Sequence, residues 1–171
     1  MGATTNRVTN CNVYVEGGSY LGRAEEVMVP EIKHKKAEHK ALGMVGSFEL
    51  FSGFEKLEGS IKWNSIDKEA LKQFATAKQL KIQVRTSIET HGATGLEAET
   101  KGVYYMTIQP SNIPGAGFKQ HDNVELSTNF SCTYIKLEIG DESIYEIDVL
   151  ANIWIVDGED QLATYRANLG I

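Results

Sequence analysis

The segment from Ala37 to Gly59 places the strongest constraint on the fold, because it combines the hydrophobicity of a core segment with the high glycine content of a loop. Glycines recur along it between aliphatic and aromatic side chains, which follow neither a helical nor a strand period. Each glycine raises the entropic cost of ordering the segment, and so many apolar groups in water would form an adhesive patch. Two interpretations stay open: another chain covers the segment, or it is a glycine-interrupted hairpin packed on its own domain.

The size and charge of the chain predict one acidic domain. Its 171 residues are enough for a single well-packed core and too few to argue for two domains. The 17 basic and 23 acidic residues give a net charge of −6, whereas a nucleic-acid grip requires clustered lysine and arginine. DNA can therefore pass near this protein but is not expected to be held by it.

Targeting and membrane signals are missing from the sequence. No basic patch followed by an apolar region marks a secretory signal, and no apolar run approaches the roughly 18 residues of a membrane-spanning helix. Cys11 and Cys132 form no metal or disulfide motif, so both are expected to be buried or inert thiols of a reducing compartment. We expect a soluble protein that is made in a cytoplasm and has no membrane partner.

Short alternations of apolar and polar residues predict a mostly β chain. Two helices are expected: Ile66–Thr76, with Asn64–Ser65 as its N-cap, and Glu159–Asn168, ended by Gly170. The polar residues Thr90–Lys101 are expected to form a surface loop. Strands are expected at residues 12–16, 24–36 with a break at Pro30, 57–63, 81–89, 103–109, 124–139, 143–149 and 152–156.

The longest expected strand, Val124–Ile139, has two different faces. One face is apolar and belongs to the core, whereas the other carries small polar groups and nearly no positive charge. A surface of that kind lies beside water or a passing polyanion without binding it. The polar positions are Glu125, Ser127, Asn129, Ser131 and Thr133, and the strand at 57–63 adds a second polar set at Glu58 and Ser60.

The fold class predicted from these elements is mainly β, as a β-sandwich or incomplete barrel with one flanking α-helix and a short C-terminal helix. Such a domain leaves the edges of its sheet open. An exposed long edge pairs readily with another copy, and a ring of copies that closes into a barrel removes the edges.

Catalytic and metal-binding signatures are absent. The sequence contains no G-x-S-x-G, H-E-x-x-H, Walker loop or Cys–His signature. His34 and His39 are five residues apart, which fits neither the helical nor the strand spacing of a metal pair. The carboxylates around Gly140 lack the order of a calcium loop. We therefore expect no enzyme activity, metal or cofactor.

Several segments, in order from about residue 8 to the last residue, carry a family resemblance. They are NVYV (12–15) with YLG (20–22), EVMVPEI (26–32), LGMVG (42–46), CTYIKL (132–137), EID (146–148), VDG (156–158), DQL (160–162), Arg166 and LGI (169–171). Together they resemble the major tail tube protein of contractile-tailed bacteriophages, a family that includes the tubes of R-type pyocins. Two features depart from it: the turn is Gly140–Asp141 where Asp-Gly is expected, and Thr86–Lys101 matches no family segment.

The resemblance implies a structural protein whose hexameric rings stack into the inner tube of a contractile tail, the conduit for genome passage into the host. It implies that each subunit gives four strands to a continuous inner barrel. About 24 strands spaced about 4.8 Å apart and tilted about 40° give a diameter of about 48 Å and a lumen of about 35–40 Å. Duplex DNA fits such a lumen.

The resemblance also implies partners and a location. The partners are further copies of the chain, the tail sheath protein, the baseplate and tail terminator proteins, and a tape measure protein in the lumen. DNA passes without specific binding. The location is the tail of the virion, after assembly in the host bacterial cytoplasm.

Applied to this chain, the resemblance predicts one tail-tube domain over residues 1–171. Its polar positions, Glu125, Ser127, Asn129, Ser131 and Thr133, with Glu58 and Ser60 as a second set, are expected to face the lumen. Six copies with −6 each carry about −36 per ring, which repels phosphate. An extended inter-subunit loop is expected at about residues 37–57, with docking residues Leu42, Gly43, Met44, Val45, Gly46, Phe48, Leu50, Phe51 and Phe54.

Two other classes of function stay open. One is a headless contractile bacteriocin or a type VI secretion-like tube that delivers proteins. The other is a monomeric β-sandwich module that binds carbohydrate through Trp63, Trp154 and Tyr104. The alternation places Trp63 and Tyr104 on core faces, which weakens the carbohydrate hypothesis.

Overall fold

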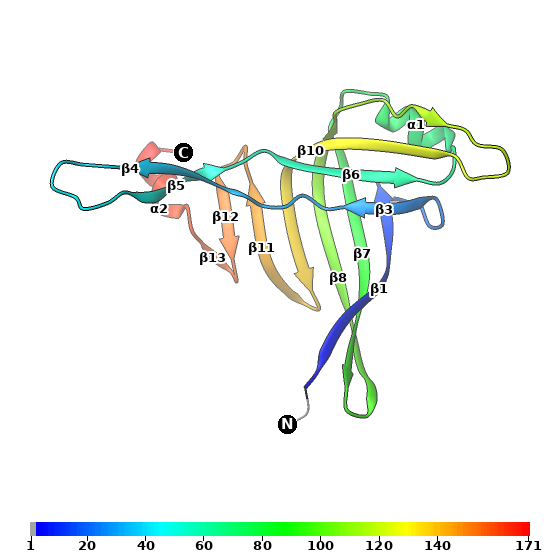
Figure 1. Cartoon of the computed structure of the whole chain (residues 1–171), viewed down its shortest axis with the longest axis horizontal. Coiled ribbons are helices and arrows are strands. Elements are labelled where there is room, and N and C mark those ends of the chain that lie inside the picture. Colours follow the sequence, from blue (N-terminus) through cyan, green and yellow to red (C-terminus); the bar gives the residue numbers. More distant parts are fainter. Residues whose placement is uncertain (1–2) are drawn as a thin grey trace.

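The computed structural model describes residues 3–171, and this range contains thirteen strands and two helices (Figure 1). The mainly β fold class predicted from the alternating pattern is confirmed. The helices are α1 (Lys68–Phe74) and α2 (Ala163–Leu169). The strands are β1 (Thr5–Val15), β2 (Gly18–Ser19), β3 (Ala24–Met28), β4 (His34–His39), β5 (Phe48–Phe54), β6 (Leu57–Trp63), β7 (Leu80–Gly92), β8 (Gly95–Pro110), β9 (Ala116–Gly117), β10 (Glu125–Ile139), β11 (Glu142–Asp148), β12 (Ile153–Val156) and β13 (Glu159–Asp160).

Strand β10 organises the larger sheet. Its first half pairs with β6 and β9, and its second half pairs with β8 and β11. The register with β8 shifts between Cys132 and Tyr134, and an irregularity of this kind bends a strand. Beyond β10, the sheet continues through β8, β7 and β1 to β2 on one side and through β11 and β12 to β13 on the other.

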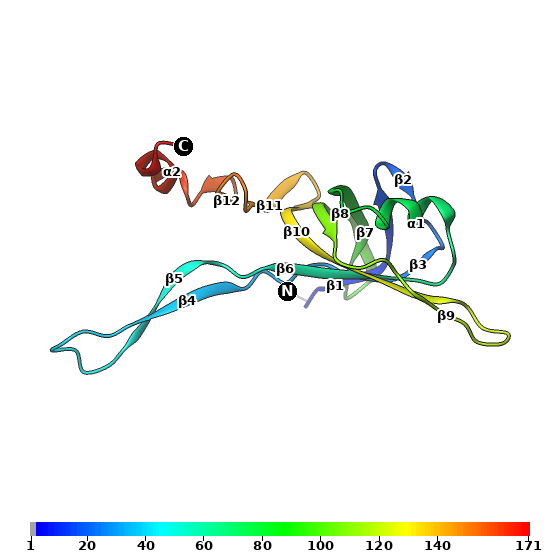
Figure 2. The same cartoon turned by 90° about the horizontal axis from the view of Figure 1, so that it is seen from above.

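The bend in β10 divides the sheet into two layers. We call β3, β6, β9 and residues 125–132 of β10 the β6 layer, and the remaining strands of this sheet the β8 layer. Figure 1 shows the strands of the two layers crossing at a steep angle, and Figure 2 shows the β6 layer along one side of the molecule. Within the described residues the result is an open sandwich and not a closed barrel. Its core contains Val13, Val15, Ile82, Val84, Met106 and Ile108 from the β8 layer and Leu57, Ile61, Trp63, Leu126 and Phe130 from the β6 layer.

Helix α1 covers one end of this core. The carboxylate of Asp67 accepts hydrogen bonds from the backbone N–H groups of Glu69 and Ala70, at 3.0 and 2.9 Å, so Asp67 is the N-cap. The predicted cap, Asn64–Ser65, is therefore wrong, because the chain bends at these residues after β6 and the helix begins only at Lys68. Ala70 and Phe74 are the buried side chains of the helix.

Helix α2 is shorter than predicted. Glu159–Asp160 pairs with β12 as strand β13, so the helix starts only at Ala163. Gly170 ends it with a φ of 72°, in the left-handed region that glycine adopts without strain, so the predicted C-terminal stop is confirmed.

The segment from Ala37 to Gly59 is regular over most of its length. β4 and β5 form a separate two-stranded hairpin, and the hairpin projects from the sandwich in line with β6 (Figures 1 and 2). The segment expected as an extended loop at about residues 37–57 is therefore a glycine-interrupted hairpin over most of its length. Most of this hairpin is not packed on its own domain, because the side chains of Phe48–Leu50 stay exposed.

A second projection is three-stranded. β7 and β8 continue past the sandwich to a tight turn at residues 92–95, and the first half of β1 pairs with β7 along this extension. We call residues 5–11, 86–92 and 95–101 the finger. The prediction of a surface loop at Thr90–Lys101 is wrong, because these residues form the end of a hairpin whose two faces are both in water.

The two cysteines differ in environment. Cys132 is buried, as expected, and burial raises the pKa of its thiol to about 12. Cys11 lies on the finger and is exposed, so of the two alternatives, a buried or an inert thiol, burial does not hold for it.

Candidate assembly surfaces

The β6 layer carries one continuous polar surface on the side away from the core. Directly opposite residues of antiparallel strands point to the same side of the sheet. The register between β6 and β10 therefore joins the polar residues predicted on residues 124–139 with those predicted on residues 57–63 in one surface. Glu26 and Met28 of β3 extend the surface, since they lie opposite Lys62 and Ser60. We call it the polar face, and its opposite pairs are Ser127 with Lys62, Asn129 with Ser60 and Ser131 with Glu58.

The charges on the polar face are paired with one another. Each of three lysines here lies beside a glutamate, and Glu26 raises the pKa of Lys62 through a hydrogen bond and its charge. Pairing leaves the face close to neutral, without the cluster of free cations that binds phosphate. The pairs are Lys62 with Glu26, Lys56 with Glu58 at 2.6 Å and Lys119 with Glu125 at 3.2 Å.

The two edges of the β6 layer differ in how their backbone groups are hydrogen-bonded. On the β10 side, the side-chain amide of Asn112 donates to the carbonyl of Ser127 at 3.0 Å and accepts from the N–H of Asn129 at 2.6 Å. Asn112 thereby replaces a neighbouring strand. On the other side, β3 pairs only with β6 among the described strands, so its outer edge is open to another chain.

The hairpin presents apolar side chains that the subunit leaves in water. Leu42 and Val45 at its tip are 105% and 108% exposed, and Met44 and Phe48 are 41% and 47% exposed. Exposed apolar groups gathered in this way mark a surface that another molecule covers.

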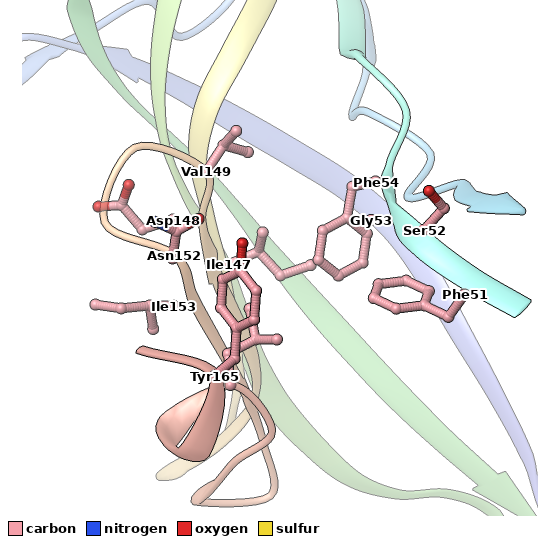
Figure 3. A pocket seen from close by; sticks show the side chains of 11 residues that line it. Phe51, Ser52, Gly53, Phe54, Ile147, Asp148, Val149, Asn152, Ile153 and Tyr165 are labelled. Atoms are coloured by element: carbon pink, nitrogen blue, oxygen red, sulfur yellow. The ribbon is translucent and has the colours of Figure 1, made fainter. Parts of the chain in front are cut away.

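The base of the hairpin is held by aromatic contacts. Phe51 and Phe54 of β5 pack against Trp154 of β12 with ring centroids 5.2 and 5.1 Å apart, and His34 of β4 contacts all three rings. Figure 3 shows the two phenylalanines across a cavity from Ile147 and Tyr165. This cavity has a volume of about 400 Å³ and is lined mainly by apolar side chains. The hairpin is thus anchored at its base and unsupported at its tip.

Most of the residues predicted to face the lumen lie together on the polar face, and most of those predicted to dock lie on the hairpin. Thr133 lies at the bend of β10, half-buried, with its hydroxyl 3.4 Å from the carbonyl of Thr107, so it stands at the edge of the polar face. Phe51 and Phe54 belong to the anchored base of the hairpin and not to its exposed tip. Sequence reasoning missed Lys62, although it follows Ser60 in the same alternation.

Other kinds of site find little support. Among residues 3–171, no helix has the length and apolar content needed to cross a membrane. The same residues bring no three His, Cys, Asp or Glu side chains close enough to hold a metal. Trp63 is only 4% exposed and Trp154 packs in the aromatic cluster, so these side chains do not offer a flat platform to a sugar.

An apolar hairpin in water, an open strand edge and a neutral polar face are features of a structural subunit that completes its contacts in an assembly. The comparison with known families agrees. A family model described as phage tail tube protein FII matches residues 5–170, so the chain belongs to that family. It is a structural protein of the phage tail tube and hence a component of the virion tail.

Two curated relatives span nearly the same length. The chain is 26% identical over 163 residues to the tail tube protein of Escherichia phage P2, covering 94% of each chain. It is 25% identical over 152 residues to the major tail tube protein of Serratia phage KSP20, covering 86% of this chain and 85% of that one.

Solved structures share the fold at low sequence identity. A chain in the extended sheath–tube complex of PVC, an extracellular contractile injection system, matches with a TM-score of 0.54 and 11% identity, covering 75% of this chain and 87% of that chain. A chain from the PVC sheath/tube terminator structure matches with a TM-score of 0.52 and 10% identity, covering 75% and 92%.

Proposed function

We propose that the whole chain, residues 1–171, acts as one tail-tube domain, and that hexameric rings of it stack into the conduit through which the genome enters the host. The observation that carries this proposal is the polar face. It is continuous across three strands, close to neutral and turned away from the core, as the wall of a channel for DNA requires.

The open edge of β3 suggests how a ring closes. Four strands, β3, β6, β9 and β10, build the β6 layer, so six copies supply the 24 strands of the expected barrel. In our proposal the β3 edge joins residues 111–117 beside β10 of the next copy. The layers then form one continuous sheet around the ring, and both edges are removed.

The hairpin provides the contact between rings. It extends beyond the sandwich, and its tip exposes Leu42 and Val45 almost completely. Docking on the adjacent ring removes these side chains from water, which stabilises the contact by roughly 25 cal/mol for each Å² of apolar surface buried.

The polar face explains how DNA moves without being held. Phosphate binding gains free energy when lysine and arginine release counterions, and here each of the three paired lysines lies beside a carboxylate. A ring of six copies has a net charge of about −36, since each chain carries −6. The lumen therefore offers phosphate no free cluster of cations, while the net charge of the whole ring repels it weakly.

The outer side and the ends of the proposed tube contact other tail proteins. We infer that the β8 layer faces the sheath, and that the ends of the tube meet the baseplate and tail terminator proteins. The fold match to chains from a sheath–tube complex and a sheath/tube terminator supports this assignment. A tape measure protein fills the lumen during assembly in the host cytoplasm, and the chain acts without catalysis or cofactor.

Size-exclusion chromatography and negative-stain electron microscopy of the purified full chain test the proposal. We expect sixfold rings and tubes with a central channel. A protein that stays monomeric at every concentration would contradict it and would favour an isolated β-sandwich module.

A further inference from the structure

The finger has no part in the function proposed above, yet its two faces differ sharply. Successive residues of a strand point to opposite faces. We call three directly opposite residues, one from each strand of the finger, a rung, and successive rungs therefore point to alternate faces. One rung is charged: Arg7, Glu89 and Glu99 lie opposite one another. The rungs on either side of it point the other way and carry no charge: Val8, Ile88 and Thr100 form one, and Asn6, Thr90 and Ala98 form the other.

The charged side of the finger is suited to water. The ring of His91 lies 2.9 Å from the carboxylate of Glu89, and this hydrogen bond, with Thr9 and Arg7 nearby, lowers the pKa of Glu89. Opposite charges interspersed in this way keep a surface solvated.

The uncharged side continues the core face of the β8 layer into solvent. Its residues alternate in step with the buried Val84, but no part of the sandwich covers them. Val8 is 55% exposed, and Cys11 is exposed as well. At the root of the finger, a Cβ on Gly102 would lie 2.6 Å from Oγ1 of Thr86 and 3.2 Å from Cδ1 of Ile88, so these two side chains lie close over the glycine. We call this surface the inner face of the finger.

We propose that the inner face covers a second copy of this chain, namely the copy that joins the open edge of β3. Figure 1 shows the finger projecting past β3, on the side of the β6 layer where that edge is open. A copy paired with β3 therefore lies against the inner face. An uncharged surface suits a contact between permanently associated subunits and does not suit a charged partner. The inference rests on the proposed ring.

The thiol of Cys11 reports directly on this contact, because it stands on the inner face while Cys132 is buried. The full chain is treated with a maleimide, both as dispersed subunits and as assembled tubes. We expect labelling of Cys11 to slow about tenfold or more in tubes, since contact excludes the reagent. The control is Ser87→Cys in a Cys11→Ser background, which places a thiol on the charged face of the same finger and should label equally in both states.

Equal labelling of Cys11 in tubes and in dispersed subunits would overturn the inference while leaving the tube intact. A chain that forms no tubes would instead defeat the proposed function, and the inference with it. The two failures are thus distinguishable.

A pair of charge variants tests the same contact by its effect on assembly. Ala98→Lys places an ammonium on the inner face, and Ser87→Lys places one on the charged face at another exposed position. We expect Ala98→Lys to raise the concentration needed for assembly about tenfold or more, because a buried unpaired charge is costly, and Ser87→Lys to leave it nearly unchanged. Circular dichroism checks that both subunits fold. Equal effects of the two variants would overturn the inference.

Discussion

The indole Nε1 of Trp63 donates a hydrogen bond to Oγ1 of Thr128 across 3.1 Å in the core. Trp63 lies on β6 and Thr128 on β10, so the bond ties together the two strands that carry the polar face on their other side. Thr128 is fully buried, and the indole accounts for a polar group on an otherwise apolar surface.

Thr128→Val keeps the shape of the side chain and removes the acceptor. The indole N–H then stays buried without a partner, so we expect the free energy of unfolding to fall by about 1–3 kcal/mol. Urea denaturation of the dispersed subunit measures it. Thr133→Val is the control and should cost less, because its hydroxyl is half-buried and makes only a long bond of 3.4 Å.

Gly59→Ala tests the close approach of β3 and β10 over β6. A Cβ at this position would lie 2.5 Å from the carbonyl oxygen of Met28 and 2.6 Å from the ring of Phe130. We expect a loss of stability of about 1–3 kcal/mol, as for other overpacked cores. Gly46→Ala is the control, since its Cβ meets nothing within 4 Å. Equal melting temperatures for the two variants would contradict the packing described here.

Met44→Asp tests the role of the hairpin in stacking. Met44 is exposed in the subunit, so the variant should fold normally, but burial of its carboxylate against the adjacent ring is unfavourable. We expect single rings or free subunits where the parent chain forms tubes, as seen by negative-stain microscopy. Phe48→Asp should behave alike. Met44→Leu preserves the apolar surface and should give normal tubes, and normal tubes from Met44→Asp would remove the hairpin from the stacking interface.

The double variant Ser127→Lys/Asn129→Lys tests whether the polar face lines the lumen. The two ammonium groups add about twelve positive charges per ring of six, which attract phosphate and release its counterions. We expect tubes of normal appearance and slower genome ejection, measured as DNA release from purified particles. Ser127→Gln/Asn129→Gln is the neutral control, and unchanged ejection by the lysine variant would place the lumen elsewhere.

Alkaline pH should weaken the subunit. Burial raises the pKa of Cys132 to about 12 from an ordinary value of 9.0, and burial together with Tyr104 raises that of Tyr145 to about 12 from 10.0. Both groups stay protonated in the folded chain where the unfolded chain ionises. Their contribution to stability is therefore complete below about pH 9 and is lost as the pH rises toward about 12.

The measurement is the free energy of unfolding as a function of pH. In Cys132→Ala the decline should begin nearer pH 10, the ordinary pKa of tyrosine, because the thiol no longer contributes. Cys11→Ala should keep the dependence of the parent chain, since that thiol is exposed in the folded state. Identical pH dependence in both variants would mean that Cys132 is not desolvated by folding.

The alternation in β10 was predictable because one face of the strand meets the core and the other meets water. That difference sets a period of two in the sequence, so the sides of Ser127 and Leu126 were assigned correctly. The union of two polar sets in one surface was not predictable, since it depends on the register between β6 and β10, which links residues far apart along the chain.

The two projections escaped prediction for a related reason. Neither face of the finger packs on the sandwich, so Thr90–Lys101 lacks the regular apolar–polar alternation of a half-buried strand and resembles a loop. In the hairpin, Gly53 has a φ of 101° and the register shifts between His34 and Lys36. These irregularities break the alternation that marks a strand.

The bend in β10 has a mechanical consequence. One unbroken backbone runs through both layers and is hydrogen-bonded to four strands, β6, β9, β8 and β11. Sliding of one layer over the other would have to break those hydrogen-bonded ladders together. We therefore expect the subunit to resist shear between its two layers. In the proposed tube we expect an axial load on the β8 layer to reach the β6 layer without shear within the subunit. A tube built from such subunits is expected to bend and twist at the interfaces between them.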